Sequence, residues 1–147
     1  MRLVYAGICA CVLVLSGAFA APFVPPGVKL AVKVAPVVQV NVARPMVEAT
    51  LTLTNSALTD AELSVRNTCL IGQWQVVDAR KVRVSGTGVC PATIDPQYHT
   101  IAGGESFSET LSLSLVGREL RENETYVLKY RYWDVPVETK FKIKLVK

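Results

Sequence analysis

Few residues of this chain could do chemistry, and they do not form a catalytic set. The single histidine, His99, is isolated in the sequence beside a tyrosine, a setting typical of a surface or packing residue. Acyl transfer needs a nucleophile, a base and an orienting group brought together, and no serine lies in a Gly-x-Ser-x-Gly turn. The acidic residues fall at ordinary turns and strand edges: Asp78, Asp95, Glu105 and Glu109. We therefore expect no enzyme, no catalytic residue and no cofactor.

The first twenty residues have the pattern of a secretory signal peptide. Arg2 precedes an apolar stretch that ends near Leu15, and the small-x-small sequence Ala18-Phe19-Ala20 follows. This arrangement predicts cleavage after Ala20 and a secreted or periplasmic chain of about 127 residues. The apolar stretch is shorter than the about 20 residues that span a bilayer, and no second run approaches that length. We therefore expect no integral membrane protein.

The remaining cysteines predict one disulfide. Signal cleavage removes Cys9 and Cys11 and leaves Cys69 and Cys90 in an oxidising compartment, where such a pair is expected to bond. The bridge would close a loop of roughly 22 residues, worth about 3 kcal/mol in the chain-entropy model. Two free thiols or a metal pair are the alternatives. A metal site is not expected, because neither cysteine has a second Cys or His at ligand spacing and His99 alone cannot complete a tetrahedral set.

The composition after cleavage indicates one small globular domain. The net charge falls from +4 to +3 with the loss of Arg2, far below the positive charge density of a nucleic-acid-binding protein. We divide the chain into a signal peptide (1–20), a proline-rich segment with an extra edge strand at 28–34 (21–36), and one β-domain (37–147).

Apolar residues alternate with polar ones along most of that domain, which predicts β-strands. The clearest pair is a hairpin from Tyr126 to Leu145 with a loop at 134–136; other strands are expected near 37–42, 48–54, 62–66, 74–84 and 110–115. No segment favours a long amphipathic helix. About seven to eight short strands separated by turn residues predict an all-β, antiparallel sandwich.

Tyr126, which follows Leu120 and Asn123, resembles a tyrosine corner, in which the hydroxyl bonds back to the preceding connection. A tyrosine that only packs in the core is the alternative.

Two surfaces could bind a partner. In the hairpin, a basic face of alternating residues is expected to share one side with Trp133, and an anionic surface is the partner it would suit: Lys129, Arg131, Lys140, Lys142 and Lys144. Lysines that only discourage edge-to-edge aggregation are the alternative.

The second surface is the connection from Ser85 to Thr100, whose candidate partner-binding residues are Gly86, Gly88, Pro91, Asp95, Tyr98 and His99. A disulfide and two prolines would stiffen it, so that little entropy is lost on binding. An ordinary strand connection is the alternative.

From Val47 to Trp133 the order of motifs resembles the BsuPI-like intracellular proteinase inhibitor family. The resemblance lies in the segments Leu51-Thr52-Leu53-Thr54-Asn55, Trp74-Gln75-Val76-Val77-Asp78, Ile101-Ala102-Gly103-Gly104-Glu105 and Thr125-Tyr126-Val127-Leu128. It implies an immunoglobulin-like sandwich and inhibition of a serine protease through exposed loops.

These observations together predict an exported, non-enzymatic binding protein. Its specific form would be a proteinase inhibitor that acts on a protein partner through the loop. The alternative is a structural, envelope-assembly or adhesion module that binds through sheet edges or the basic face.

Overall fold

Alternating apolar and polar residues build the strands of the computed structural model, which describes residues 23–116 and 120–146. The described part contains these strands: β1 (Val28–Lys33), β2 (Val37–Asn41), β3 (Met46–Asn55), β4 (Ala61–Val65), β5 (Gly72–Val77), β6 (Arg83–Gly86), β7 (Gln97–Ile101), β8 (Ser106–Ser114), β9 (Thr125–Tyr132) and β10 (Val135–Val146). One 3₁₀ turn, η1 (Thr68–Leu70), interrupts them. The predicted all-β fold is confirmed, with ten strands where about seven to eight were expected. The predicted signal peptide lies outside the described residues.

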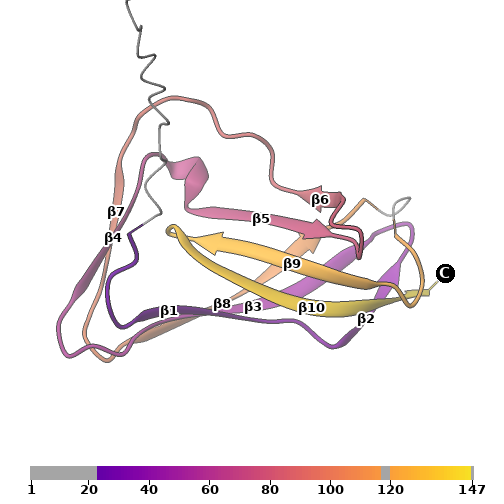
Figure 1. The fold of residues 1–147 in the computed structure, drawn as a ribbon, viewed down its shortest axis with the longest axis horizontal. Coiled ribbons are helices and arrows are strands. Elements are labelled where there is room, and N and C mark those ends of the chain that lie inside the picture. Colours follow the sequence, from indigo (N-terminus) through magenta and orange to yellow (C-terminus); the bar gives the residue numbers. More distant parts are fainter. Residues whose placement is uncertain (1–22, 117–119, 147) are drawn as a thin grey trace, which may run out of the picture.

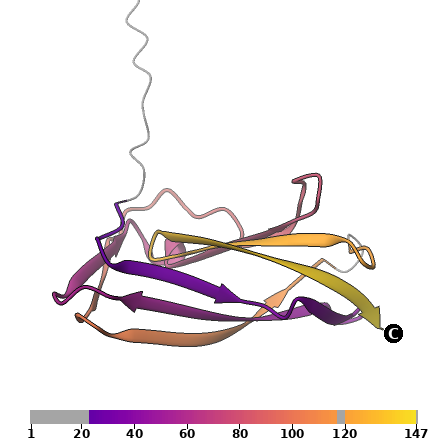
Figure 2. The same cartoon turned by 60° about the horizontal axis from the view of Figure 1, so that its bottom comes forward.

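Two sheets form the layers of the sandwich (Figures 1 and 2). One has the order β1-β3-β8, and the other has the order β2-β10-β9-β5-β6. Every pairing within these sheets is antiparallel except β2 with β10, which is parallel. The chain passes from the first sheet to the second through Ala35-Pro36, where the Pro36 carbonyl accepts a hydrogen bond from the Lys142 amide at 2.8 Å. The N-terminal segment therefore supplies an antiparallel edge strand, β1, to the first sheet and a parallel edge strand, β2, to the second.

The core lies between the two sheets and takes one face of each. Tyr126 and Phe141 are opposite each other on β9 and β10, almost completely buried, with ring centroids 6.0 Å apart. Leu51 and Leu53 on β3, in the other layer, belong to the same buried cluster. Burying side chains of this size contributes about 1.5–3 kcal/mol each. The period-two pattern therefore predicted the inward-facing residues of these strands.

The β9–β10 hairpin turns one residue earlier than expected. Trp133 and Asp134 both have positive φ, 47° and 62°, as a two-residue type I′ turn requires. Val135 and Pro136 already belong to β10 and pair with Tyr132 and Arg131. The prediction of a loop at 134–136 was wrong because the proline was taken as part of a turn, whereas a proline can occupy the first residues of a strand.

A third element, the ribbon β4–β7, forms a two-stranded sheet of its own and pairs with no strand of either layer. Its strands pair antiparallel with each other, and Figure 1 shows the ribbon at the end of the sandwich where β9 turns into β10. Leu63, Val65 and Ile101 bury the ribbon's inner face. The His99 ring stacks on Trp133, with centroids 5.3 Å apart and planes 21° apart. The ribbon thus packs against the sandwich with side chains alone.

The tyrosine corner is present. The Tyr126 hydroxyl accepts a hydrogen bond from the Arg121 backbone amide at 2.8 Å, and Tyr126 itself is fully buried. The bond fixes the connection that leads into β9, as in Greek-key sandwiches. Burial raises the pKa of Tyr126, so the hydroxyl stays neutral and available for this contact.

Replacing Tyr126 by phenylalanine should destabilise the domain without changing its fold. The ring keeps its contact with Phe141, while the Arg121 amide loses its acceptor, and we expect a loss of about 1–2 kcal/mol. Urea denaturation measures this loss. Tyr98→Phe is the matched control, because the Tyr98 hydroxyl is on a side chain that is 65% exposed. Equal midpoints for the two variants would contradict a role of the Tyr126 hydroxyl.

Candidate functional site

The connection from β6 to β7 is long, and one buried side chain holds its backbone by hydrogen bonds. We call residues 87–96 the clamped loop. The Asn67 amide donates to the carbonyls of Pro91 and Thr93, at 3.1 and 3.0 Å, and Asn67 is only 3% exposed. The Asp95 amide donates to the Arg66 carbonyl at 2.9 Å. The backbone of the clamped loop is therefore held by the residues that directly follow β4.

The disulfide secures the start of the same loop. Cys69 in η1 is bonded to Cys90, with Cα atoms 5.7 Å apart, as the sequence predicted. The Gln73 side-chain amide lies beside the bridge and donates to the Cys69 carbonyl at 2.6 Å. Its oxygen accepts from the Thr87 hydroxyl at 2.7 Å, and the Thr87 amide donates to the Trp74 carbonyl at 2.9 Å. Loop and β5 are thereby joined by a covalent bond and a local hydrogen-bond network.

The opposite end of the ribbon has its own buried asparagine. Asn55 is fully buried at the end of β3. Its amide donates to the carbonyls of Thr59 and Ile101, at 2.9 and 3.0 Å, and its oxygen accepts from the Ala57 amide. The ribbon is therefore tied at both ends, and β7 cannot move away without breaking buried polar contacts.

Exposed apolar side chains project from the clamped loop. Val89 is 97% exposed and Ile94 is 75% exposed. Neither residue was among the predicted partner-binding residues, although an isolated aliphatic residue in a Gly- and Pro-rich loop was the available signal. Both flank the clamped carbonyls in the sequence, so a rigid backbone presents them to solvent.

The structure separates the six loop residues that the sequence proposed. Gly88, Pro91, Asp95 and Tyr98 are exposed and remain candidates for partner contact. Gly86 has a structural role, because a Cβ atom there would lie 2.6 Å from the Trp74 carbonyl oxygen. His99 is engaged with Trp133 and lies on the opposite face of β7 from its neighbour Tyr98.

The five basic residues of the hairpin do share one outward face, as their register shows. Lys129 lies opposite Glu138, and Lys140 and Lys142 follow on the same side of β10. Two of the five are in ion pairs: Lys129 with Glu138 at 3.2 Å, and Arg131 with Asp134 at 3.6 Å. Lys140, Lys142 and Lys144 form no ion pair within the described part of the chain. The expectation that Trp133 belongs to this face was wrong, because Trp133 is in the turn and packs on the ribbon.

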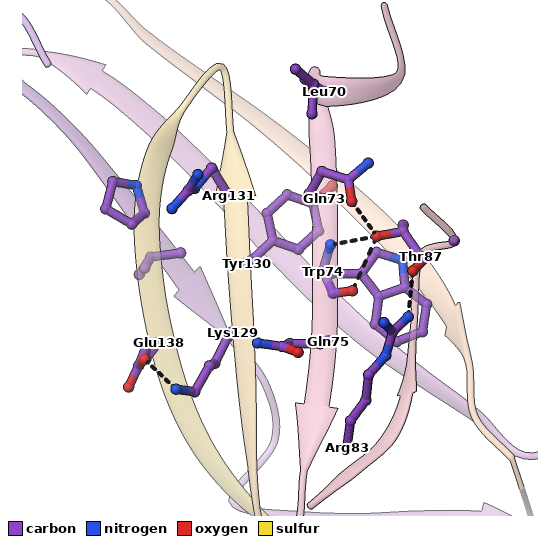
Figure 3. A pocket seen from close by; sticks show the side chains of 13 residues that line it. Leu70, Gln73, Trp74, Gln75, Arg83, Thr87, Lys129, Tyr130, Arg131 and Glu138 are labelled. Carbon is purple, nitrogen blue, oxygen red and sulfur yellow. Dashed lines mark hydrogen bonds and ion pairs between the residues drawn. The ribbon is translucent and has the colours of Figure 1, made fainter. Parts of the chain in front are cut away.

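A hollow of about 520 Å³ lies between this basic face and the base of the clamped loop. Figure 3 shows Lys129 and Arg131 on one side of it, Arg83 and Thr87 on the other, and Gln75 between them. The Arg83 guanidinium donates to the Thr87 carbonyl. The hollow therefore joins the two surfaces that the sequence proposed separately, and its rim combines cationic and amide groups.

Tyr130 is the residue lining the hollow whose pKa is shifted. Burial, with a contribution from the negative charge of Glu109, raises the pKa of Tyr130 to about 12, which keeps the phenol protonated. Within residues 23–116 and 120–146, no group of three or more His, Cys, Asp or Glu side chains is placed to hold a metal ion. The arrangement can offer shape, hydrogen bonds and charge to a partner.

Comparisons with known proteins give no family. No protein-family model matches the chain, and no curated protein matches it. Solved structures that it is similar to include a β-glucosidase from Listeria innocua, at 9% identity and a TM-score of 0.44 over 80% of this chain and 16% of the other. A Bacteroides uniformis β-glucuronidase has 11% identity and a TM-score of 0.44 over 76% and 12%. The chain spans less than a fifth of these enzymes, and such distant similarities carry no inference about its function.

Replacing Asn67 by aspartate should weaken the attachment of the clamped loop and leave the sandwich folded. In Asn67→Asp, carboxylate oxygens replace the amide donor and face the carbonyls of Pro91 and Thr93, so both hydrogen bonds are lost. We expect about tenfold faster limited proteolysis within residues 87–96, which corresponds to about 1.4 kcal/mol of local stability. Asn41→Asp is the matched control, because the Asn41 oxygen is an acceptor that aspartate retains. Equal cleavage rates in both variants would contradict the clamp.

Proposed function

We propose that this chain is an exported, non-enzymatic binding protein that docks a protein partner through the clamped loop. The observation that carries this proposal is the buried Asn67 amide, which holds two loop carbonyls while Val89 and Ile94 stay exposed. A loop fixed before binding loses little conformational entropy in the complex, and exposed aliphatic side chains gain free energy when a partner covers them. The export signal at residues 1–20 is part of this proposal.

The disulfide supports an oxidising compartment, where such bridges form and persist. In the described residues, no helix has the length and hydropathy to cross a membrane.

A secreted serine protease is the first partner to test. The resemblance to a proteinase inhibitor family motivates this choice, and the loop has the construction that such an inhibitor needs. It is exposed from Pro91 to Pro96, and the clamp and the disulfide would hold both sides together if a protease cut one peptide bond. An inhibitor of this kind resists digestion because the cut ends stay in place.

The chain should inhibit at least one secreted serine protease at micromolar concentration and survive the incubation. Ile94→Asp should weaken binding at least about tenfold, because a charge would replace an aliphatic side chain at the position that the partner covers in the complex. Leu58→Asp is the matched control, since Leu58 is fully exposed in the turn after β3 and away from the loop. Residual protease activity and titration calorimetry measure the effect.

Rapid degradation by every protease of the panel would rule out inhibition. Docking through the loop would be overturned if a partner captured by the wild-type chain bound Ile94→Asp and Leu58→Asp equally well.

The row Lys140, Lys142 and Lys144 favours a second function, binding of an anionic envelope surface by an assembly or adhesion module. These three side chains point outward from β10 without an ion pair among the described residues. Three positive charges in one row attract polyanions, and salt screens the attraction.

Charge reversal distinguishes this function. Replacing the three lysines by glutamate should abolish retention on anionic beads at low salt. Reversal of Lys29, Lys33 and Lys81 is the control with the same change in net charge. If the first variant is retained as strongly as the second, net charge explains the binding and the basic face has no such role.

A further inference from the structure

The outer edge of β8 is paired with no strand of the described part of the chain. β8 ends the three-stranded sheet, and Figure 2 shows it along the lower margin of the molecule with β3 on its inner side. Residues 106–110 are exposed throughout. Edge strands are usually blunted by proline, lysine, a bulge or an inward charge, and β8 has only the last of these, Glu109.

The hydrogen-bond pattern shows which backbone groups point to solvent. At the two ends of the β3–β8 pairing, the Leu115 amide donates to the Pro45 carbonyl and the Asn55 amide to the Glu105 carbonyl. Residues at odd positions of β8 therefore bond to β3, because hydrogen-bonded pairs alternate along an antiparallel ladder. The N–H and C=O groups of the even positions face the open edge: Ser106, Ser108, Thr110, Ser112 and Ser114. The Ser114 carbonyl already accepts from the Ser85 hydroxyl.

The side chains of β8 are arranged almost as a palindrome. The outward face carries a hydroxyl at every even position, and three of these hydroxyls already contact hydroxyls of β3, at 2.9 to 3.4 Å. On the inner face, Phe107 and Leu113 stand at equal distances from Thr110. Phe107 is 46% exposed although it points toward the core side. A second copy running antiparallel would therefore meet like groups at every hydroxyl position.

Glu109 selects the register. If the two-fold axis passed through Glu109, the two carboxylates would be directly opposite each other, which is destabilising. If it passes through Thr110, Ser108 pairs with Ser112, Thr110 pairs with its own copy, and Glu109 faces Leu111. The pairs between even positions match backbone groups that point to the open edge with groups of the same kind, whereas Glu109 and Leu111 keep their backbone hydrogen bonds to β3.

We propose that two copies of this chain associate through β8, antiparallel and centred on Thr110, and join their three-stranded sheets into one six-stranded sheet. The partner is a second copy because the strand complements itself. This interface is separate from the clamped loop, so the dimer would present two loops at once and increase avidity for a partner with two sites.

Sedimentation equilibrium of the chain from residue 21 onward tests the proposal. We expect a reversible dimer, and Thr110→Pro should weaken it at least about tenfold, because an outward N–H is lost from each copy at the axis. Proline is tolerated there when its nitrogen faces away from the sheet. Thr110→Ser is the matched control and should dimerise like the wild-type chain. A wild-type chain that stays monomeric up to millimolar concentration overturns the proposal, as does a Thr110→Pro variant that melts normally and still dimerises.

Crosslinking tests the register and also covers a proline variant that does not fold. Cys69 and Cys90 are bonded to each other, so a new cysteine reacts alone. Thr110→Cys should give a covalent dimer with a short bis-maleimide, because paired Cα atoms at this position are about 5.5 Å apart. Ser112→Cys places the two thiols about 13 Å apart along the strands and should crosslink poorly. Equal yields, or no covalent dimer from Thr110→Cys, would overturn the pairing centred on Thr110.

Discussion

Two buried asparagine amides hold the β4–β7 ribbon, which pairs with no strand of either layer of the sandwich. Asn55 closes one end of the β4–β7 ribbon and Asn67 closes the other, each by donating to two backbone carbonyls. A buried amide that loses its partners is destabilising by about 1–3 kcal/mol, so each asparagine resists separation of the segments it joins. The disulfide and the His99–Trp133 stack complete the attachment. Of these contacts, the Asn67 hydrogen bonds and the disulfide hold the clamped loop itself.

This attachment explains how one domain can present several separate surfaces. The sandwich core fixes β5, β9 and β10, whose outward side chains form the basic face and most of the hollow. The ribbon fixes the clamped loop at the rim of that hollow. The edge of β8 belongs to the other sheet, so self-association there would leave both the loop and the basic face accessible.

Charged side chains on the basic face and in the β5–β6 turn differ in whether a neighbouring group pairs with them. On the basic face, Glu138 and Asp134 neutralise Lys129 and Arg131, which concentrates the unpaired charge on the outer half of β10. Asp78, in the β5–β6 turn, has a lowered pKa, chiefly because it accepts a hydrogen bond from the Val82 amide, with help from Arg80. That carboxylate is therefore committed to the turn, and stability gained from it would be lost only as the pH falls through its lowered pKa.

Local patterns in the sequence determined the strands, the tyrosine corner and the disulfide, because period-two alternation and the pairing of cysteines depend on few distant contacts. The shared side of the five basic residues followed from the same alternation. The sequence did not determine that β4 and β7 leave the sheets, that Asn67 clamps the loop, or that Trp133 turns toward His99. Those features depend on which residues meet across long separations, such as Asn67 with Thr93. Only the packed tertiary structure decides which residues meet, because the NH₂ group of a buried amide bonds to whichever carbonyls the fold brings within reach.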